Sequence, residues 1–146
     1  MPAGTRTSLL SRLLELCEDF RAETGIRCEV AIAERHTRFG DEVNEVIYRT
    51  VRELLTNVRQ HAHAKHVMVS SLGRRDGSIG ICVADDGVGL PAHRRRGNPF
   101  DESGGIGLWS IDQRLREFDA MLDIEAAAGR GTRAMVILPG SLVLTD

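Results

Sequence analysis

Residues 41–61 have the sequence DEVNEVIYRTVRELLTNVRQH. Its apolar residues recur every three or four positions and form one stripe: Val43, Val46, Ile47, Val51, Leu54, Leu55 and Val58. This spacing matches the period of an α-helix that packs one face against a core. The sequence therefore predicts a long helix from Asp41 to about His61 at the centre of the domain.

Further helix-like and strand-like segments lie on both sides of this helix. Two more amphipathic helices are predicted, from Ser8 to about Thr24 and from Ile106 to about Asp119. Strand-like runs cover Ile26–Ala33, Lys65–Leu72, Ser78–Ala84, Met121–Ala126 and Thr132–Leu138, with turns at Asp76-Gly77 and Gly129-Arg-Gly131. Hairpin-paired strands and one-faced helices predict a two-layer α/β sandwich, with helices on one face of a mixed, mostly antiparallel sheet.

Length and composition predict one folded domain. The chain has 146 residues, of which 42% are hydrophobic and 27% charged, as in an average globular protein. We expect residues 1–40, a helix and a strand, to pack on the same domain as residues 41–146. The three cysteines, Cys17, Cys28 and Cys82, form no C-x-x-C pair, so we expect buried free thiols.

The net charge argues against two classes of partner, and the hydropathy pattern indicates where the protein is located. The net charge of -2 provides no positive field for nucleic acid or an anionic membrane, so neither is an expected partner. The Met1–Ser8 start is polar and no apolar run approaches the ~20 residues of a membrane span. We expect the chain in the cytoplasm, either as a separate protein or as the cytoplasmic part of a membrane-bound sensor.

The lysine content restricts the kinds of nucleotide site. Lys65, in Ala-Lys-His, is the single lysine among the 19 basic residues. A P-loop, a protein-kinase strand lysine and a pyridoxal Schiff base each require a lysine in a different context. A nucleotide site in this chain must therefore use another design.

Three polar or glycine-rich motifs are candidates for such a site. Glu53 and Asn57 lie four residues apart, on one helix face, although an exposed polar edge is the more common explanation of such a pair taken alone. Asp85-Asp86-Gly87-Val88-Gly89 follows a strand, where a carboxylate could accept a hydrogen bond from an amino group; a capped turn is the alternative. Gly104-Gly105-Ile106-Gly107-Leu108 enters a helix, as phosphate-binding loops do, or forms a hinge.

Together with Gly129-Arg-Gly131-Thr132, these motifs occur in an order that resembles a known family. The chain is similar to the ATP-binding domain of bacterial sensor histidine kinases, of the Bergerat type shared with gyrase and Hsp90. The similarity covers about Asp41 to Pro139, and Arg52-Glu-Leu-Leu-Thr-Asn-Val58 with Gly105-Ile-Gly-Leu-Trp-Ser-Ile111 looks most like the nitrate-sensor and lipid-sensor branch.

The resemblance implies a role for each matching residue. Asn57 would coordinate a Mg²⁺ that bridges the phosphates of ATP, and Glu53 would orient water or assist proton transfer. Asp85 would bind the adenine amino group. The implied nucleotide-binding set is Asn57, His61, Asp85, Gly87, Gly89, Gly105, Gly107, Leu108 and Thr132, with Leu90–Gly104 as a lid.

The chain also departs from the family pattern. Gln60 stands where a basic residue is common, and Arg59, His61 or a lid arginine are candidate substitutes. Asp119-Ala120 replaces the usual Gly-Gly. None of the five histidines is followed by an acidic residue, so the acceptor histidine is expected on another segment, and the implied partners are a dimerisation and phosphoacceptor domain and a response regulator.

The predicted activity is therefore transfer of the ATP γ-phosphoryl group to a histidine, that is, a protein-histidine kinase. Alternatives are a stand-alone anti-sigma-factor serine kinase and a nucleotide-binding module that no longer transfers phosphate. Trp109 is expected to be a packing residue, with a partner-binding edge as the alternative. His61, His63 and His66 are not expected to bind zinc, because their spacing crosses a helix end.

Overall fold

The computed structural model describes residues 8–87, 105–127 and 131–145. Its strands form one five-stranded sheet in the order β1-β2-β3-β5-β4. Their bounds are β1 Arg27–Ala31, β2 His66–Gly73, β3 Ile79–Asp85, β4 Met121–Ala127 and β5 Gly131–Leu138. Strand β1 runs parallel to β2, and the other three neighbouring pairs are antiparallel. The sheet is mixed and mostly antiparallel, as predicted.

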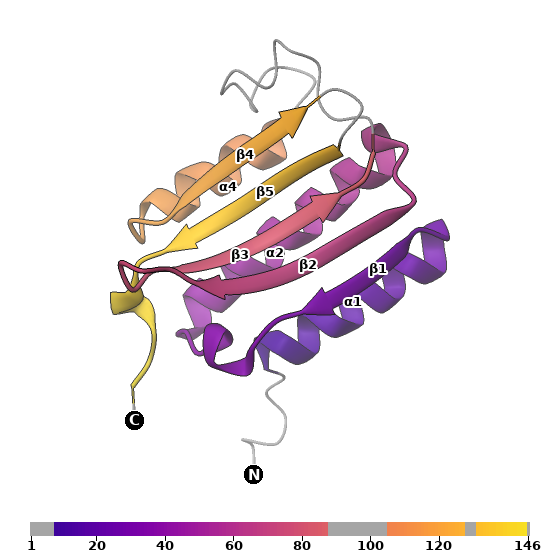
Figure 1. Cartoon of the computed structure of the whole chain (residues 1–146). Coiled ribbons are helices and arrows are strands. Elements are labelled where there is room, and N and C mark those ends of the chain that lie inside the picture. The colour runs from indigo at the N-terminus through magenta and orange to yellow at the C-terminus, as the bar shows by residue number, and fades with distance from the viewer. Residues whose placement is uncertain (1–7, 88–104, 128–130, 146) are drawn as a thin grey trace.

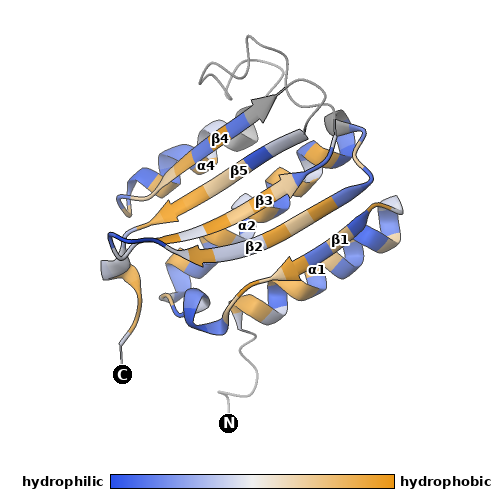
Figure 2. Ribbon diagram, in the orientation of Figure 1, coloured by the Kyte–Doolittle hydropathy of each residue, from blue (hydrophilic) through white to orange (hydrophobic). Residues whose placement is uncertain are grey.

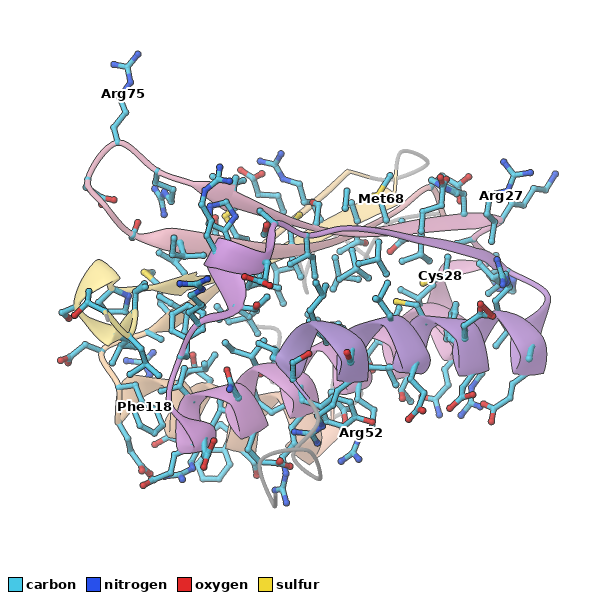
Figure 3. All side chains as sticks on the ribbon, turned by 90° about the horizontal axis from the view of Figure 1, so that it is seen from below. Arg27, Cys28, Arg52, Met68, Arg75 and Phe118 are labelled. Carbon is cyan, nitrogen blue, oxygen red and sulfur yellow. The ribbon has the colours of Figure 1, made fainter. Side chains whose placement is uncertain are left out.

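Three helices cover one face of this sheet: α1 (Leu9–Thr24), α2 (Asp41–Asn57) and α4 (Gly105–Arg116). The edge-on view in Figure 3 shows the two layers, with Cys28 between sheet and helices and Met68 on the opposite face of the sheet. Figure 1 shows that α2 lies behind the centre of the sheet. The two-layer α/β sandwich expected from the periodicity is confirmed.

The core lies between the two layers. Fully buried side chains come from both of them: Leu13, Ile47, Val51, Leu55, Val67, Val69, Ile81, Leu115, Val136 and Leu138. The stripe predicted on residues 41–61 is buried here as a whole. Hydrophobic and hydrophilic segments alternate along the helices, whereas the turn between β2 and β3 is hydrophilic (Figure 2). All three cysteines are buried free thiols, as expected.

Local signals set the ends of several elements. Ser8 caps α1 by accepting a hydrogen bond from the Ser11 N–H, and Gly25 ends it with φ 76°, the left-handed conformation that glycine tolerates best. Asp41 and Glu42 lie in the first turn of α2, where the helix dipole favours negative charge. Gly77 supplies the positive φ, 90°, of the turn predicted at Asp76-Gly77.

The structure differs from the sequence prediction in two segments that connect the main elements. The α-helical part of the central helix ends at Asn57, and a π-helix, η3 (Val58–Ala62), continues it. The predicted polar connection before α2 contains a 3₁₀ turn, η2 (Glu34–Thr37), with a buried His36. The ring Nδ1 of His36 lies 2.7 Å from Ser71 Oγ, so this polar side chain is buried with a partner.

Trp109 is not a packing residue. Its side chain is 52% exposed, because the packed face of α4 carries Leu115 and the half-buried Ile111. Trp109 lies two residues before Ile111, about 200° away around the helix, and so faces outward. A second local feature is Asp119, which adopts φ 59° where the family has glycine, while Ala120 beside it is buried. In the described parts of the chain no helix is both long and apolar enough to cross a membrane.

Candidate functional site

Four chain segments carrying the predicted site residues meet at one end of the sandwich. Figure 1 shows the C-terminal ends of α2 and β3 at the same end as the N-terminal ends of α4 and β5. These termini place Asn57, Asp85, Gly105 and Thr132 at that end. The motifs that lie up to 75 residues apart in the sequence are therefore neighbours in the fold.

Asp85 is the last residue of β3, and its side chain lies on the helix-facing side of the sheet. It follows Ile81 and Val83 with the two-residue period of a strand, and both of these are buried in the core. Burial raises the pKa of Asp85, and hydrogen bonds from the Gly87 and Thr132 backbone partly offset this rise. The Gly87 N–H donates to Asp85 Oδ1 at 2.8 Å. Asp85 is thus a half-buried acceptor.

The neighbouring strand β5 approaches Asp85 closely through Gly131 and Thr132. Thr132 is the register partner of Asp85, and it also pairs with Ala126 of β4. Gly131 has φ 89°, and a Cβ at this position would lie 2.0 Å from the Asp85 carbonyl oxygen. Glycine is therefore required here for two reasons, the left-handed backbone and the contact. Gly131 belongs to one of the sequence motifs but not to the predicted nucleotide-binding set.

At the end of α2, Glu53 and Asn57 are both half-buried. One turn of helix separates them, so their side chains lie on the same face. The π-helix η3 starts directly after Asn57 and ends at His63, a non-glycine residue with φ 52°. Single-turn π-helices and left-handed non-glycine residues are frequent at functional sites. Gln60 is exposed in η3.

Asp86 is a further residue at this end that sequence reasoning did not select. Its Oδ1 accepts hydrogen bonds from the backbone N–H groups of Lys65 at 2.8 Å and His66 at 3.0 Å. These two hydrogen bonds lower its pKa, so the carboxylate is ionised at neutral pH. The adjacent Asp85 and Asp86 thus have opposite pKa shifts, because partial burial is the largest effect on Asp85 and backbone hydrogen bonds are the largest effect on the exposed Asp86.

Part of the predicted set cannot be placed to the same depth. Gly89 and the predicted lid Leu90–Gly104 lie outside the described residues. Gly105, Gly107 and Leu108 form the first turn of α4, and His61 belongs to η3, but for these four only the backbone is described. The ring Nε2 of His66 lies 2.5 Å from Glu29 Oε1.

The residues present suit a magnesium nucleotide in their chemistry. Asn57 and Glu53 offer amide and carboxylate oxygens, the ligands that a hard cation prefers. Asp85 offers a half-buried acceptor for an amino group, and the first turn of α4 offers backbone N–H groups and the positive end of a helix dipole. A cavity of about 540 Å³ between α2 and α4 is lined by the first half of α2, away from these groups.

Comparison with known proteins agrees with this arrangement. A family model, the histidine kinase-, DNA gyrase B-, and HSP90-like ATPase, matches residues 42–142. A sensor-like histidine kinase of Chloroflexus aurantiacus is 30% identical over 108 residues, which are 70% of this chain and 17% of that protein. The sensor histidine kinase LnrJ of Bacillus subtilis is 29% identical over 124 residues, 85% of this chain and 28% of the relative.

Solved structures give the same fold. The histidine kinase domain of the Erythrobacter litoralis blue-light activated histidine kinase superposes with a TM-score of 0.70 at 22% identity, over 92% of this chain and 62% of that chain. The chain spans less than a third of the two curated relatives named above. Similarity to sensor histidine kinases does not favour an anti-sigma-factor serine kinase. The family match covers more than two thirds of the sequence, and the chain belongs to the histidine kinase-, DNA gyrase B- and HSP90-like ATPase family.

Proposed function

We propose that this chain is the ATP-binding catalytic domain of a two-component sensor histidine kinase, transferring the γ-phosphoryl group of ATP to a histidine on a separate segment. The observation that carries the proposal is the convergence of a half-buried acceptor, Asp85, with the Glu53–Asn57 helix end and the start of α4. A base at Asp85 and phosphates near α4 would span this end of the sandwich.

Each residue then has a defined task. Asp85 accepts a hydrogen bond from the adenine amino group, and Gly87, Gly89 and Thr132 line the base. The amides of Gly105, Gly107 and Leu108, with His61, contact the phosphates. Asn57 holds the Mg²⁺, which would neutralise phosphate charge.

Glu53 acts on the attacking group. As a half-buried carboxylate one turn before Asn57, it orients the acceptor imidazole or takes its proton. The imidazole nitrogen forms a bond to the γ-phosphorus, the bond from that phosphorus to the β–γ bridging oxygen breaks, and ADP leaves. Most of the catalytic effect comes from positioning and electrostatics.

The partners follow from the missing acceptor. His36, His61, His63, His66 and His93 are followed by Thr, Ala, Ala, Val and Arg. A dimerisation and phosphoacceptor domain would supply the histidine, and a response regulator would receive the phosphoryl group. The reaction would take place in the cytoplasm, with residues 1–40 and 41–146 acting as one domain.

The test is phosphorylation in trans. The purified chain is incubated with γ-labelled ATP and Mg²⁺, alone and with the phosphoacceptor domain of a sensor histidine kinase. We expect acid-labile label on the acceptor domain and none on the isolated chain, and we expect Asn57→Ala to abolish the transfer. Acid-labile label on the isolated chain, or ATP binding without transfer to its cognate acceptor domain, would contradict the proposal.

A further inference from the structure

Asp86 joins two parts of the site that come from different elements. Its Oδ1 accepts the N–H groups of Lys65 and His66, at 2.8 Å and 3.0 Å, and its own N–H donates to the His66 carbonyl at 3.2 Å. Three hydrogen bonds thus connect one residue after β3 to the start of β2. Hydrogen bonds to a charged acceptor are among the stronger ones in proteins.

The segment held by Asp86 is the connection that leaves the Asn57 helix end. Asn57 is followed by η3, then by His63 in the left-handed conformation, then by the buried Ala64 and by Lys65. The chain therefore needs only a few residues to pass from the proposed metal ligand to the amides bound by Asp86. Asp86 also follows Asp85, the proposed base-binding residue, directly in the sequence.

The sheet ladder alone does not hold this connection. Val67 and Asp85 are the last register pair between β2 and β3, so Lys65 lies beyond the ladder with β3. The Lys65 carbonyl accepts a hydrogen bond from the Arg27 N–H of β1, whereas the Lys65 N–H donates its hydrogen bond to Asp86 Oδ1. The Asp86 carboxylate accepts the hydrogen bond of the Lys65 N–H, which the β2–β3 ladder does not pair.

We propose that Asp86 is a positioning residue of the nucleotide site: its carboxylate holds the η3–β2 connection against the end of β3 and so sets the spacing between Asp85 and Asn57. This inference rests on the proposed function, because it assigns Asp85 to the base and Asn57 to the metal side. Asp86 itself need not contact the nucleotide.

The test compares three variants by calorimetric titration with Mg-ATP and Mg-GTP, well below their melting temperatures. Asp86→Ala removes both hydrogen bonds, and we expect about tenfold weaker ATP binding and a smaller preference for ATP over GTP, because small misplacements are costly in such sites. Asp86→Asn keeps an oxygen acceptor and should bind ATP within about threefold of wild type.

Asp76→Ala is the matched control. Asp76 Oδ1 also accepts two hydrogen bonds, from the Ser78 N–H at 2.9 Å and the Ser78 hydroxyl at 2.6 Å, but before β3 instead of after it. Asp76→Ala should lose stability as Asp86→Ala does. It should keep the wild-type affinity for ATP and the wild-type preference for ATP over GTP. Should Asp86→Ala not fold, Asp86→Ser, whose shorter side chain cannot reach both amides, is compared in its place.

The outcomes separate the two proposals. A wild-type chain without ATP binding would refute the proposed function. A wild type that prefers ATP, with Asp86→Ala showing the same affinity and preference, would overturn the positioning role alone. Asp86→Asn as weak as Asp86→Ala would also overturn it, because the amide oxygen can accept the same two hydrogen bonds.

Discussion

At the scale of single residues, Asp85 shows how a binding group can oppose stability. Its carboxylate is partly buried at the end of β3, and among the described residues it accepts hydrogen bonds from the Gly87 and Thr132 backbone N–H groups. Burial raises its pKa above the ordinary 3.8, so its ionised form is less favourable in the folded chain than in the unfolded chain. A ligand amino group would compensate for part of this penalty.

The first prediction concerns Asp85→Asn, which removes the buried charge at nearly constant size. At pH 7 the empty variant should melt at a higher temperature than wild type and bind ATP more weakly. Because the folded pKa is raised, the charge lowers stability above that pKa, and the difference should shrink as the pH falls toward 3.8. Thermal melts between pH 4 and pH 7 measure it; a variant less stable than wild type at pH 7 would contradict the assignment.

A second prediction separates backbone strain from close contact. Gly77 and Gly131 have nearly the same φ, 90° and 89°, but a Cβ at Gly77 would meet nothing within 4 Å, whereas at Gly131 it would meet the Asp85 carbonyl. Gly77→Ala should lower the free energy of unfolding by about 1 kcal/mol, from the left-handed conformation alone. Gly131→Ala should lower it by more than about 2 kcal/mol. Urea unfolding decides this, and equal losses would show that β5 can move away from Asp85.

At the scale of elements, α1 and β1 extend the sheet and its helical layer. Strand β1 pairs in parallel with β2, and α1 contributes Leu9, Leu13, Cys17 and Phe20 to the same core as α2. The 3.6-residue pattern of the sequence located this helix to within one residue. What the pattern could not show is that the segment packs against the central sheet, since that depends on contacts distant in sequence.

A third prediction tests how strongly α1 belongs to the core. Leu13 is 0% exposed and its neighbour Leu14 is 47% exposed. Leu13→Ala should lower the free energy of unfolding by about 2–5 kcal/mol, because it leaves a cavity. Leu14→Ala should change it by less than about 0.5 kcal/mol. Chemical denaturation of both variants makes the comparison; similar small losses would mean that α1 packs only loosely.

Sequence periodicity also explains which local features were missed. Residues 58–62 continue the apolar pattern through Val58, so an α-helix and a π-helix look alike there. Trp109 was expected to be a packing residue, but the orientation of α4 is set by Ile111 and Leu115. The apolar character of one helical residue does not reveal whether its side chain faces the core.

At the scale of the whole molecule, the order of the motifs predicted the family better than any one motif did. Glu53–Asn57, Asp85–Gly89 and Gly105–Leu108 each have an ordinary structural explanation, and their meaning depends on the topology that brings the ends of α2, β3, β5 and α4 together. Gly131 and Asp86 could not be singled out in this way. Their roles depend on strand register and on backbone distances, which appear only in the folded chain.

In the proposed function, this end of the sandwich binds a magnesium nucleotide, and Asn57 is the residue that responds to the metal. The most direct measurement is calorimetric titration of ATP into wild type, Asn57→Ala and Asn44→Ala, each with Mg²⁺ and with a chelator. Asn44 lies near the opposite end of α2, where its amide donates to the Phe39 carbonyl at 3.1 Å, and is the control. We predict stronger binding with Mg²⁺ in wild type and Asn44→Ala, and no effect of Mg²⁺ in Asn57→Ala; a full Mg²⁺ effect in Asn57→Ala would contradict the claim.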